Sequence, residues 1–303
     1  MRYICAQPAS IYYSWQVDAM LYSFLDNGVE AKQIDIVFAD KPQYENACYY
    51  LLDKYPDVNF YFYPDTRPKV KYISSVRPHI LKKHFLKYPE LYKGTFLYHD
   101  CDIVLTRPLE IDNLVCGCNQ TCYLSDTISY IGYEYILSKG RDVLELMCSV
   151  ANISEETLKQ NQKNSGGCHY LLKNIDYKYW EEVEMDCENL FVEVVELNKK
   201  KKAENEDYHS LQIWCSDMWA VLWNLWKRNR NTKIAAELNF TWATHHINYW
   251  GTNPIYHNAG INNDNNKEFY KSKYLVTKPP KNLEINPDLA CYNYYEIIKK
   301  TLK

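Results

Sequence analysis

Two aspartates separated by one residue raise the question of what this chain does. Asp100 and Asp102 stand in the stretch YHDCDIVLTRPL, just before the apolar run Ile103–Leu105. In extended chain, side chains at i and i+2 point the same way, so these carboxylates would converge. Such a pair repels unless a cation lies between its members, and Mg²⁺ or Mn²⁺ takes carboxylate and phosphate oxygens as ligands. The spacing therefore predicts a metal-dependent diphosphate anchor, with a loop cap as the alternative.

The elements that must position this pair alternate between strand and helix. Apolar runs predict strands at 2–6, 34–38 and 58–62, and a fourth within 96–109; helical spacing predicts a helix capped by Ser14, one over 44–55 and one capped by Ser75. This order predicts an α/β fold with a mostly parallel central sheet and helices on both faces. Ligands of such sheets bind beyond the carboxyl ends of the strands, where Asp100 and Asp102 would lie.

The second half of the chain is less regular. It predicts strands at 121–125 and 167–172 and helices at 142–151, 217–226 and 294–302. The apolar residues of 217–226 recur on one helical face. The run Lys199–Lys202, followed by Ala-Glu-Asn-Glu-Asp, predicts a solvated loop.

Charge and cysteine content exclude some classes of protein. The 303 residues carry a formal net charge of -3, so no overall positive field exists to hold a nucleic-acid backbone, and a local positive patch remains open. Eleven cysteines follow an N-terminus without signal-peptide features, which predicts free thiols and a cytoplasmic protein. The cluster Cys116, Cys118 and Cys122 lacks zinc-knuckle spacing, so ordinary thiols are expected there. No apolar run has the length of a transmembrane segment.

The stretch YHDCDIVLTRPL resembles the Asp-x-Asp segment of GT-A-fold, nucleotide-sugar-dependent glycosyltransferases. Other segments resemble that family in the same order. YICAQPASIYYSWQVDAML resembles the strand and helix that cradle the base, and SSVRPHIL resembles the helix that brings an arginine to the donor. NSGGCHYLL resembles the strand that lets the sugar approach the backbone, WCSDMWAV resembles the acidic helix start that faces the acceptor, and IYHNAG resembles the late His-x-x-Gly segment. The resemblance spans about residues 3–260 and places the chain in no named subfamily.

The resemblance implies a GT-A (Rossmann-like) fold with a smaller mixed acceptor-side region. We expect a single glycosyltransferase domain over 1–275, in which 1–110 binds the nucleotide sugar and 111–275 faces the acceptor, followed by a C-terminal extension with a short helix at 276–303. The implied activity moves a sugar, a hexose by expectation, from a UDP-sugar or another nucleotide-diphosphate sugar to a hydroxyl acceptor. Mn²⁺ is the expected cofactor, with Mg²⁺ as the alternative, because a neutral imidazole ligand suits Mn²⁺ better.

The resemblance also assigns roles to individual residues. The metal ligands would be Asp100, Asp102 and His257; the donor-binding residues Gln7, Tyr12, Arg77, Asp100, Asp102, Gly166 and Gly167; and the catalytic residues Asp217 and Asp126. Each has an ordinary alternative. His257 would be a surface histidine, with the pair His245-His246 as the rival ligand. Arg77 would be an exposed helix residue, the glycines would serve a tight turn, Tyr12 would pack in the core, Asp217 would cap a helix, and Asp126 would end a turn.

Other activities remain open at this stage. A metal-dependent nucleotidyltransferase also uses paired aspartates on a strand, but the Gly-rich phosphate loop that it would usually carry is not evident. A non-catalytic nucleotide-sugar-binding protein would share the fold. The acceptor is open among a glycan, a lipid-linked sugar, a protein side chain and a modified nucleic-acid base, and both retaining and inverting stereochemistry are open.

Overall fold

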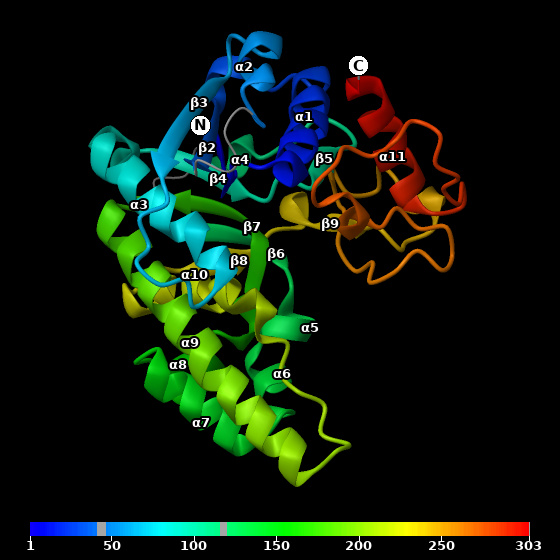
Figure 1. Ribbon diagram of the computed structural model, residues 1–303. Coiled ribbons are helices and arrows are strands. Elements are labelled where there is room, and N and C mark those ends of the chain that lie inside the picture. Colours follow the sequence, from blue (N-terminus) through cyan, green and yellow to red (C-terminus); the bar gives the residue numbers. More distant parts are fainter. Residues whose placement is uncertain (41–46, 116–119, 303) are drawn as a thin grey trace. The chain divides into compact units, whose positions relative to one another are not determined.

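The protein is an α/β protein whose chain folds into two compact units. Figure 1 shows the computed structural model, which describes residues 1–40, 47–115 and 120–302. The first unit combines Met1–Pro64, Phe96–Cys116 and Ala236–Lys303, and the second combines Asp65–Thr95 and Gly117–Ala235. Each unit is therefore assembled from segments that lie far apart in the sequence.

Four parallel strands form the sheet of the first unit. Their spatial order is β3 (Asn59–Pro64), β2 (Ile34–Asp40), β1 (Arg2–Pro8) and β4 (Thr95–His99). Cys5 in β1 lies opposite Ile36 of β2 and opposite His99 of β4. The helices of this unit are α1 (Ile11–Asp26), α2 (Tyr50–Lys54), α4 (Asp112–Val115) and α11 (Ala290–Thr301). The parallel order predicted from the alternating elements is confirmed.

A second, smaller sheet completes the first unit. It contains β5 (Ile103–Leu105), β10 (Ile255–His257) and β9 (Phe240–Trp242) in that order; β10 runs antiparallel to β5 and parallel to β9. The expected smaller mixed region is therefore present. An aromatic core around the buried rings of Trp15, Tyr256 and Phe269 joins this sheet to α1 and α11. The predicted fourth strand is thus two strands in different sheets, and the chain changes sheets between His99 and Ile103.

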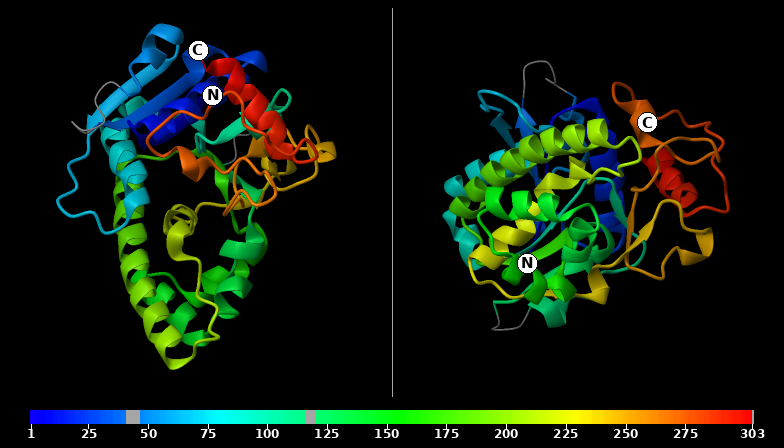
Figure 2. Two further views of the ribbon diagram at one scale, coloured as in Figure 1. Left: turned by 45° about the vertical axis from the view of Figure 1, so that its right-hand side comes forward. Right: turned by 90° about the horizontal axis from the view of Figure 1, so that it is seen from below.

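The second unit is built around strands β7 (Gly166–Lys173), β6 (Cys122–Asp126) and β8 (Thr232–Ile234). β6 pairs with β8 in parallel and with β7 antiparallel. The helices are α3 (Val76–Lys87), α5 (Ile128–Ile131), α6 (Tyr133–Leu137), α7 (Arg141–Val150), α8 (Glu155–Gln160), α9 (Tyr177–Glu204) and α10 (Ser216–Lys227). The long helix α9, seen along its length in Figure 2, packs against α3, α7 and α10.

Several local expectations need correction. Helix α1 begins at Ile11 after Ser10, so Ser14 does not cap it; instead, the Ser14 hydroxyl donates to the Ile11 carbonyl at 2.9 Å. The helix expected over 44–55 spans Tyr50–Lys54 within the described residues, and 41–46 lie outside them. The run Lys199–Lys202 belongs to α9 rather than to a loop. Cys116 and Cys118 lie outside the described residues; the nine described cysteines are free thiols.

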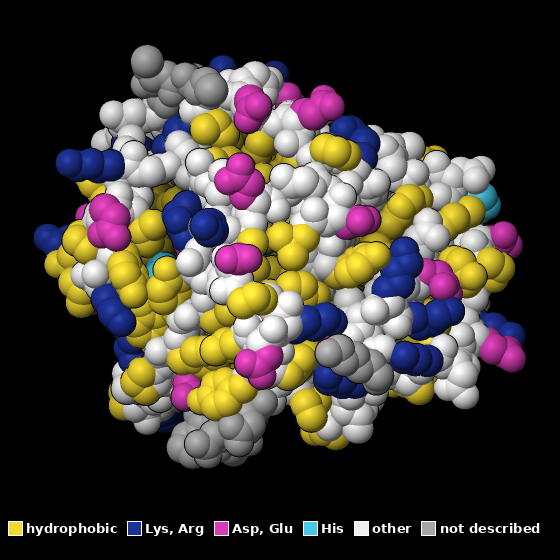
Figure 3. Space-filling model, turned by 90° about the horizontal axis from the view of Figure 1, so that it is seen from above, with side chains coloured by type: hydrophobic (Ala, Val, Ile, Leu, Met, Phe, Trp, Pro, Cys, Tyr) yellow, Lys and Arg dark blue, Asp and Glu magenta, His cyan; other side chains and the backbone are white. Residues whose placement is uncertain are grey.

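The described surface is mixed in charge. On the face shown in Figure 3, acidic and basic side chains are interspersed among polar and apolar ones. Within residues 1–40, 47–115 and 120–302, the helices include none with the length and apolar character needed to cross a bilayer.

Candidate active site

The turn between β4 and β5 carries both aspartates and lies beyond the carboxyl end of β4. Strand β10 pairs antiparallel with β5 so that His257 is the register partner of Ile103, one residue from Asp102. The backbone N–H of Asn258 donates to the Asp102 carbonyl oxygen at 2.9 Å, which fixes the two segments at this point. Strand pairing therefore brings together side chains that are more than 150 residues apart in the sequence.

The three predicted metal ligands face one another. His257 Nε2 lies 3.4 Å from Asp102 Oδ1 and 3.8 Å from Asp100 Oδ2. Asp102 and His257 are buried, and the side chain of Asp100 is partly exposed. An oxygen of each carboxylate therefore lies within 4 Å of the same imidazole nitrogen, and we call Asp100, Asp102 and His257 the cluster at the end of β4. Their role as metal ligands stays a prediction.

A fourth residue, Lys271, was not predicted to belong to this cluster. It lies in a 3-10 helix (Lys271–Tyr274), and its ammonium group donates to Asp102 Oδ2. Burial alone would raise the pKa of Asp102, but the Lys271 and His257 charges outweigh it and hold that pKa well below its ordinary value. Burial would likewise lower the pKa of Lys271, and the Asp102 carboxylate reverses that effect and raises it. Asp102 is therefore ionised at neutral pH.

The predicted nucleotide-side residues lie in the same unit. Gln7 is buried near the end of β1, and Tyr12 is in the first turn of α1. Burial raises the pKa of Tyr12 to about 12, while the Lys271 charge opposes that shift and the Asp102 charge supports it. Tyr12 therefore lies close enough to this cluster to sense both charges. Its ring also packs edge-on against Trp15 at 6.1 Å between centroids, so it takes part in core packing as well.

By residue type, this cluster has ligands that a divalent cation accepts, and their binding of one stays a prediction. It offers one oxygen from each of two carboxylates and one imidazole nitrogen, a combination that Mn²⁺ accepts. The second oxygen of Asp102 is engaged by Lys271, so Oδ1 is the oxygen that faces His257.

In the second unit, the structure pairs two residues that were assigned separate roles. Arg77 Nη2 lies 2.7 Å from Asp217 Oδ2, so the predicted diphosphate-binding arginine is ion-paired with the predicted acceptor-side carboxylate. Asp217 is the second residue of α10, as expected. Its other oxygen accepts a hydrogen bond from the Tyr72 hydroxyl at 2.7 Å. Tyr72 was missed because nothing in its local sequence connects it to a residue 145 positions away.

The remaining predicted residues of the second unit lie on or beside β6 and β7. Asp126 is exposed at the end of β6, and its Oδ1 accepts the Ile128 backbone N–H at 3.1 Å, as a turn aspartate does. At Gly166, a Cβ would collide with the backbone oxygen of Ser125, so the absent side chain lets β7 lie close to β6. At Gly167 a Cβ would lie 2.6 Å from the Tyr170 hydroxyl. Packing within the unit thus accounts for both glycines, and their predicted contact with a donor sugar stays a prediction.

Known proteins resemble this chain in fold but not in sequence. Neither the models of known protein families nor the curated proteins match this sequence. Among solved structures, the bifunctional glycosyltransferase WbbM is similar with a TM-score of 0.51 and 10% sequence identity, over 98% of this chain and 49% of that chain. This chain therefore spans about half the length of WbbM.

Two further solved structures are more distant. The galactosyltransferase LgtC in complex with donor and acceptor sugar analogues has a TM-score of 0.42 and 10% identity, over 99% of this chain and 96% of that chain. The glycosyltransferase GlyE of Streptococcus pneumoniae TIGR4 has a TM-score of 0.43 and 10% identity, over 99% and 63%. At 10% identity, the similarity to WbbM shows the fold alone. The chain has the α/β fold of GT-A type that the sequence led us to expect.

Proposed function

We propose that this protein is a metal-dependent glycosyltransferase that moves a sugar from a nucleotide-diphosphate sugar, with UDP as the expected nucleotide, to a hydroxyl acceptor. The observation that carries the proposal is the cluster at the end of β4, where His257 Nε2 lies 3.4 Å and 3.8 Å from oxygens of Asp102 and Asp100. Ligands of open α/β sheets bind at this edge, and this donor set is the kind that joins a divalent cation to a diphosphate. The fold shared with WbbM agrees with this class of enzyme.

In this proposal, Asp100, Asp102 and His257 hold Mn²⁺ or Mg²⁺, which would neutralise charge on the leaving diphosphate. Lys271 keeps Asp102 ionised and adds a positive charge beside the same carboxylate. Gln7 and Tyr12 would line the nucleotide side of the cluster. With a divalent cation bound, the charges of the cation and of Lys271 would exceed those of the two carboxylates, so a diphosphate would meet a local positive environment in a chain that is acidic overall.

On the acceptor side, we assign Asp217 the role of the carboxylate that orients or deprotonates the acceptor hydroxyl. The glycosidic bond to the diphosphate breaks as the acceptor oxygen bonds to the anomeric carbon, and the hydroxyl proton leaves to a base. Arg77 and Tyr72 hold the two oxygens of Asp217, which fixes the carboxylate plane. Asp126, Gly166 and Gly167 remain proposed contacts of the sugars, and hexose transfer remains the proposed specificity.

The test is UDP release from a panel of UDP-sugars, measured with Mn²⁺ and with EDTA. A metal ion contributes several kcal/mol of transition-state stabilisation, so Asp100→Asn, Asp102→Asn and His257→Gln should each lower kcat/KM by about 100-fold or more. Asp112→Asn is the matched control, because Asp112 is an exposed acid of the same unit in α4. Full activity in EDTA or in Asp102→Asn would contradict the proposal. Tight UDP-sugar binding without turnover would instead identify a binding protein.

A further inference from the structure

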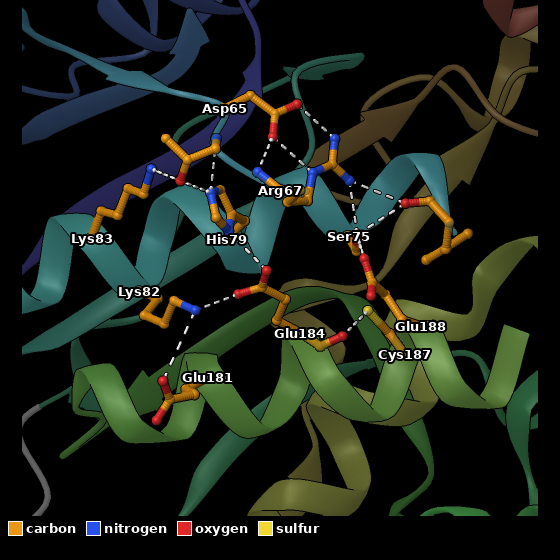
Figure 4. Close-up of polar contacts among 12 residues, drawn as sticks. Asp65, Arg67, Ser75, His79, Lys82, Lys83, Glu181, Glu184, Cys187 and Glu188 are labelled. Carbon is orange, nitrogen blue, oxygen red and sulfur yellow. Dashed lines mark hydrogen bonds and ion pairs between the residues drawn. The ribbon is translucent and has the colours of Figure 1, made fainter. Parts of the chain in front are cut away.

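One buried arginine holds the segment that precedes α3 in a fixed conformation. The Arg67 side chain is only 5% exposed, and its Nε and Nη2 donate to the two oxygens of Asp65, both at 2.9 Å. Its Nη1 lies 3.1 Å and 3.2 Å from the carbonyl oxygens of Tyr72 and Ile73, and 2.8 Å from the Ser75 hydroxyl. Figure 4 shows Arg67 with Asp65 and Ser75. The guanidinium therefore ties the start of the segment 65–75 to its end, in a planar geometry that a lysine cannot reproduce.

The same segment is anchored to two helices of the second unit. The Ser75 hydroxyl lies 2.7 Å from Glu188 Oε1 of α9. His79 of α3 contacts Glu184 of α9 through Nδ1 at 2.7 Å, and its Nε2 lies 3.3 Å from the backbone nitrogen of Thr66. These contacts appear together in Figure 4. We call Asp65, Arg67, Ser75 and Glu188 the clasp.

Tyr72 is the residue whose backbone the clasp holds. Its ring is buried and stacks on Phe191 of α9, with 4.8 Å between centroids and 26° between planes. Its hydroxyl lies 2.6 Å from the Trp214 carbonyl oxygen and 2.7 Å from Asp217 Oδ1. Burial, with a smaller contribution from the Asp217 charge, raises the pKa of Tyr72 above its ordinary value, against the opposing Arg77 charge. The hydroxyl therefore keeps its proton and remains a donor.

We propose that Arg67 is a positioning residue that acts through Tyr72 on Asp217. Its contacts to the Tyr72 and Ile73 carbonyls fix the backbone beside the Tyr72 ring, and the ring hydroxyl then reaches one oxygen of Asp217 while Arg77 takes the other. The hydrogen bonds of Arg67 go to Asp65, Tyr72, Ile73 and Ser75 rather than to Asp217, so its influence must pass through the segment 65–75. This inference rests on the proposed function for the role of Asp217 in transfer, but the route from Arg67 to Asp217 can be tested without it.

The kinetic test is a double-mutant cycle with Arg67→Gln and Tyr72→Phe. Loss of a hydrogen bond to a charged group lowers a rate by about tenfold, so each single variant should lose about tenfold in kcat for UDP release while the donor KM stays within about twofold. If Arg67 acts through Tyr72, the double variant is no slower than the slower single variant. A loss near the product of the two, about 100-fold, means independent action and overturns the proposal.

Two further variants give the cycle its controls. Arg67→Lys keeps the charge but loses the planar fork, so its kcat should stay within about threefold of Arg67→Gln. Arg141→Gln is the matched control: Arg141 also pairs with carboxylates in the second unit, at Glu145 and Glu155, but its side chain is 55% exposed. It should match the unaltered protein in kcat. Full recovery in Arg67→Lys would show that charge rather than positioning is what matters, and would also overturn the proposal.

Hydrogen exchange followed by mass spectrometry separates this inference from the proposed function. Arg67→Gln and Tyr72→Phe should both speed amide exchange in peptides that cover 213–217, whereas Arg141→Gln should not. Tyr72→Phe retains the ring and its stacking, so it serves if Arg67→Gln does not fold. If no UDP-sugar is turned over, the proposed function fails and exchange still decides the route. Unchanged exchange at 213–217 in both Arg67→Gln and Tyr72→Phe would overturn the inference even if the enzyme is active.

Discussion

Substitution of Lys271 should change the affinities of the cluster at the end of β4 for a cation and for a diphosphate in opposite directions. Lys271 contacts the carboxylate of Asp102, which is one of the proposed metal ligands. A lysine there repels a cation that binds the same carboxylate, but it attracts a diphosphate. We therefore expect Lys271→Gln to tighten the binding of free Mn²⁺ and to weaken the binding of UDP. Opposite changes in two affinities cannot come from a general loss of stability.

The size of the effect follows from the charges. Two unit charges 4 Å apart interact by about 1 kcal/mol in water, and a divalent cation doubles this, so the repulsion is about 1–2 kcal/mol. The water-like value is a lower bound, because the Lys271 side chain is only 27% exposed and that of Asp102 only 8%. Since 1.4 kcal/mol is a factor of ten in an equilibrium constant, Mn²⁺ should bind at least about tenfold more tightly to Lys271→Gln.

The assay is titration of Mn²⁺ followed by electron paramagnetic resonance, and calorimetry with UDP in the presence of Mn²⁺. Lys273→Gln is the matched control, because Lys273 lies in the same 3-10 helix, is 49% exposed and pairs with Asp264 instead. It should change neither affinity by more than about twofold, as expected for an exposed ion pair. Weaker or unchanged Mn²⁺ binding in Lys271→Gln would refute the reasoning, and would show that Lys271 and the cation do not share Asp102.

Two further predictions concern the second unit. Gly166→Ala should lower the free energy of unfolding by about 1–3 kcal/mol, because the added methyl group would collide with the backbone. Gly94→Ala should lower it less, because a Cβ there would lie 3.3 Å from its nearest contact. Urea titration of both variants measures the difference. A Gly166→Ala protein of normal stability that binds UDP-sugar poorly would favour the ligand role instead. Burial would raise the pKa of Glu184, but His79 and Lys82 outweigh it and lower that pKa. A lowered carboxyl pKa contributes stability that is complete above about pH 4.5, the ordinary pKa of a glutamate side chain, and that is lost as the pH falls through the folded-state pKa. Below about pH 4.5, the urea midpoint should therefore fall less in Glu184→Gln than in the unaltered protein.

Local pattern was sufficient for the parallel part of the fold. Strands β1, β2 and β3 were predicted because each contains a continuous apolar run, and their positions differ from prediction by at most two residues at the ends. Helix α9 was missed although its pattern was present: Tyr179, Val183, Cys187, Leu190 and Val194 are buried at helical spacing. The lysine run at its end was interpreted as a solvated loop. Lysine is nevertheless a good helix former, and its positive charge is favourable in the last turns of a helix.

The cluster at the end of β4 could be predicted only where it depends on short motifs. Asp100 and Asp102 are two residues apart, and His257 precedes a turn, so local sequence indicates them. Lys271 lies 169 residues from Asp102, in a polar segment with several lysines, and no spacing rule distinguishes it from its neighbours. The predicted capping role of Ser75 is wrong. Ser75 precedes α3 as expected of a cap, but its hydroxyl lies within hydrogen-bonding distance of the Tyr72 carbonyl oxygen and of Glu188 instead of capping the helix.

The position of the cluster depends on register more than on any single residue. The chain leaves the parallel sheet at His99 and enters the mixed sheet at Ile103, so the two aspartates occupy the turn that joins them. His257 reaches that turn because β10 pairs with β5 in a register that sets it opposite Ile103. Side chains alternate along a strand, so a slip of one residue would turn the imidazole to the other face and leave the buried Asp102 carboxylate with Lys271 as its remaining partner in this cluster. The residues that hold this register, Val104 and Tyr256, are fully buried in the aromatic core, and that core therefore helps to place His257 beside the two aspartates.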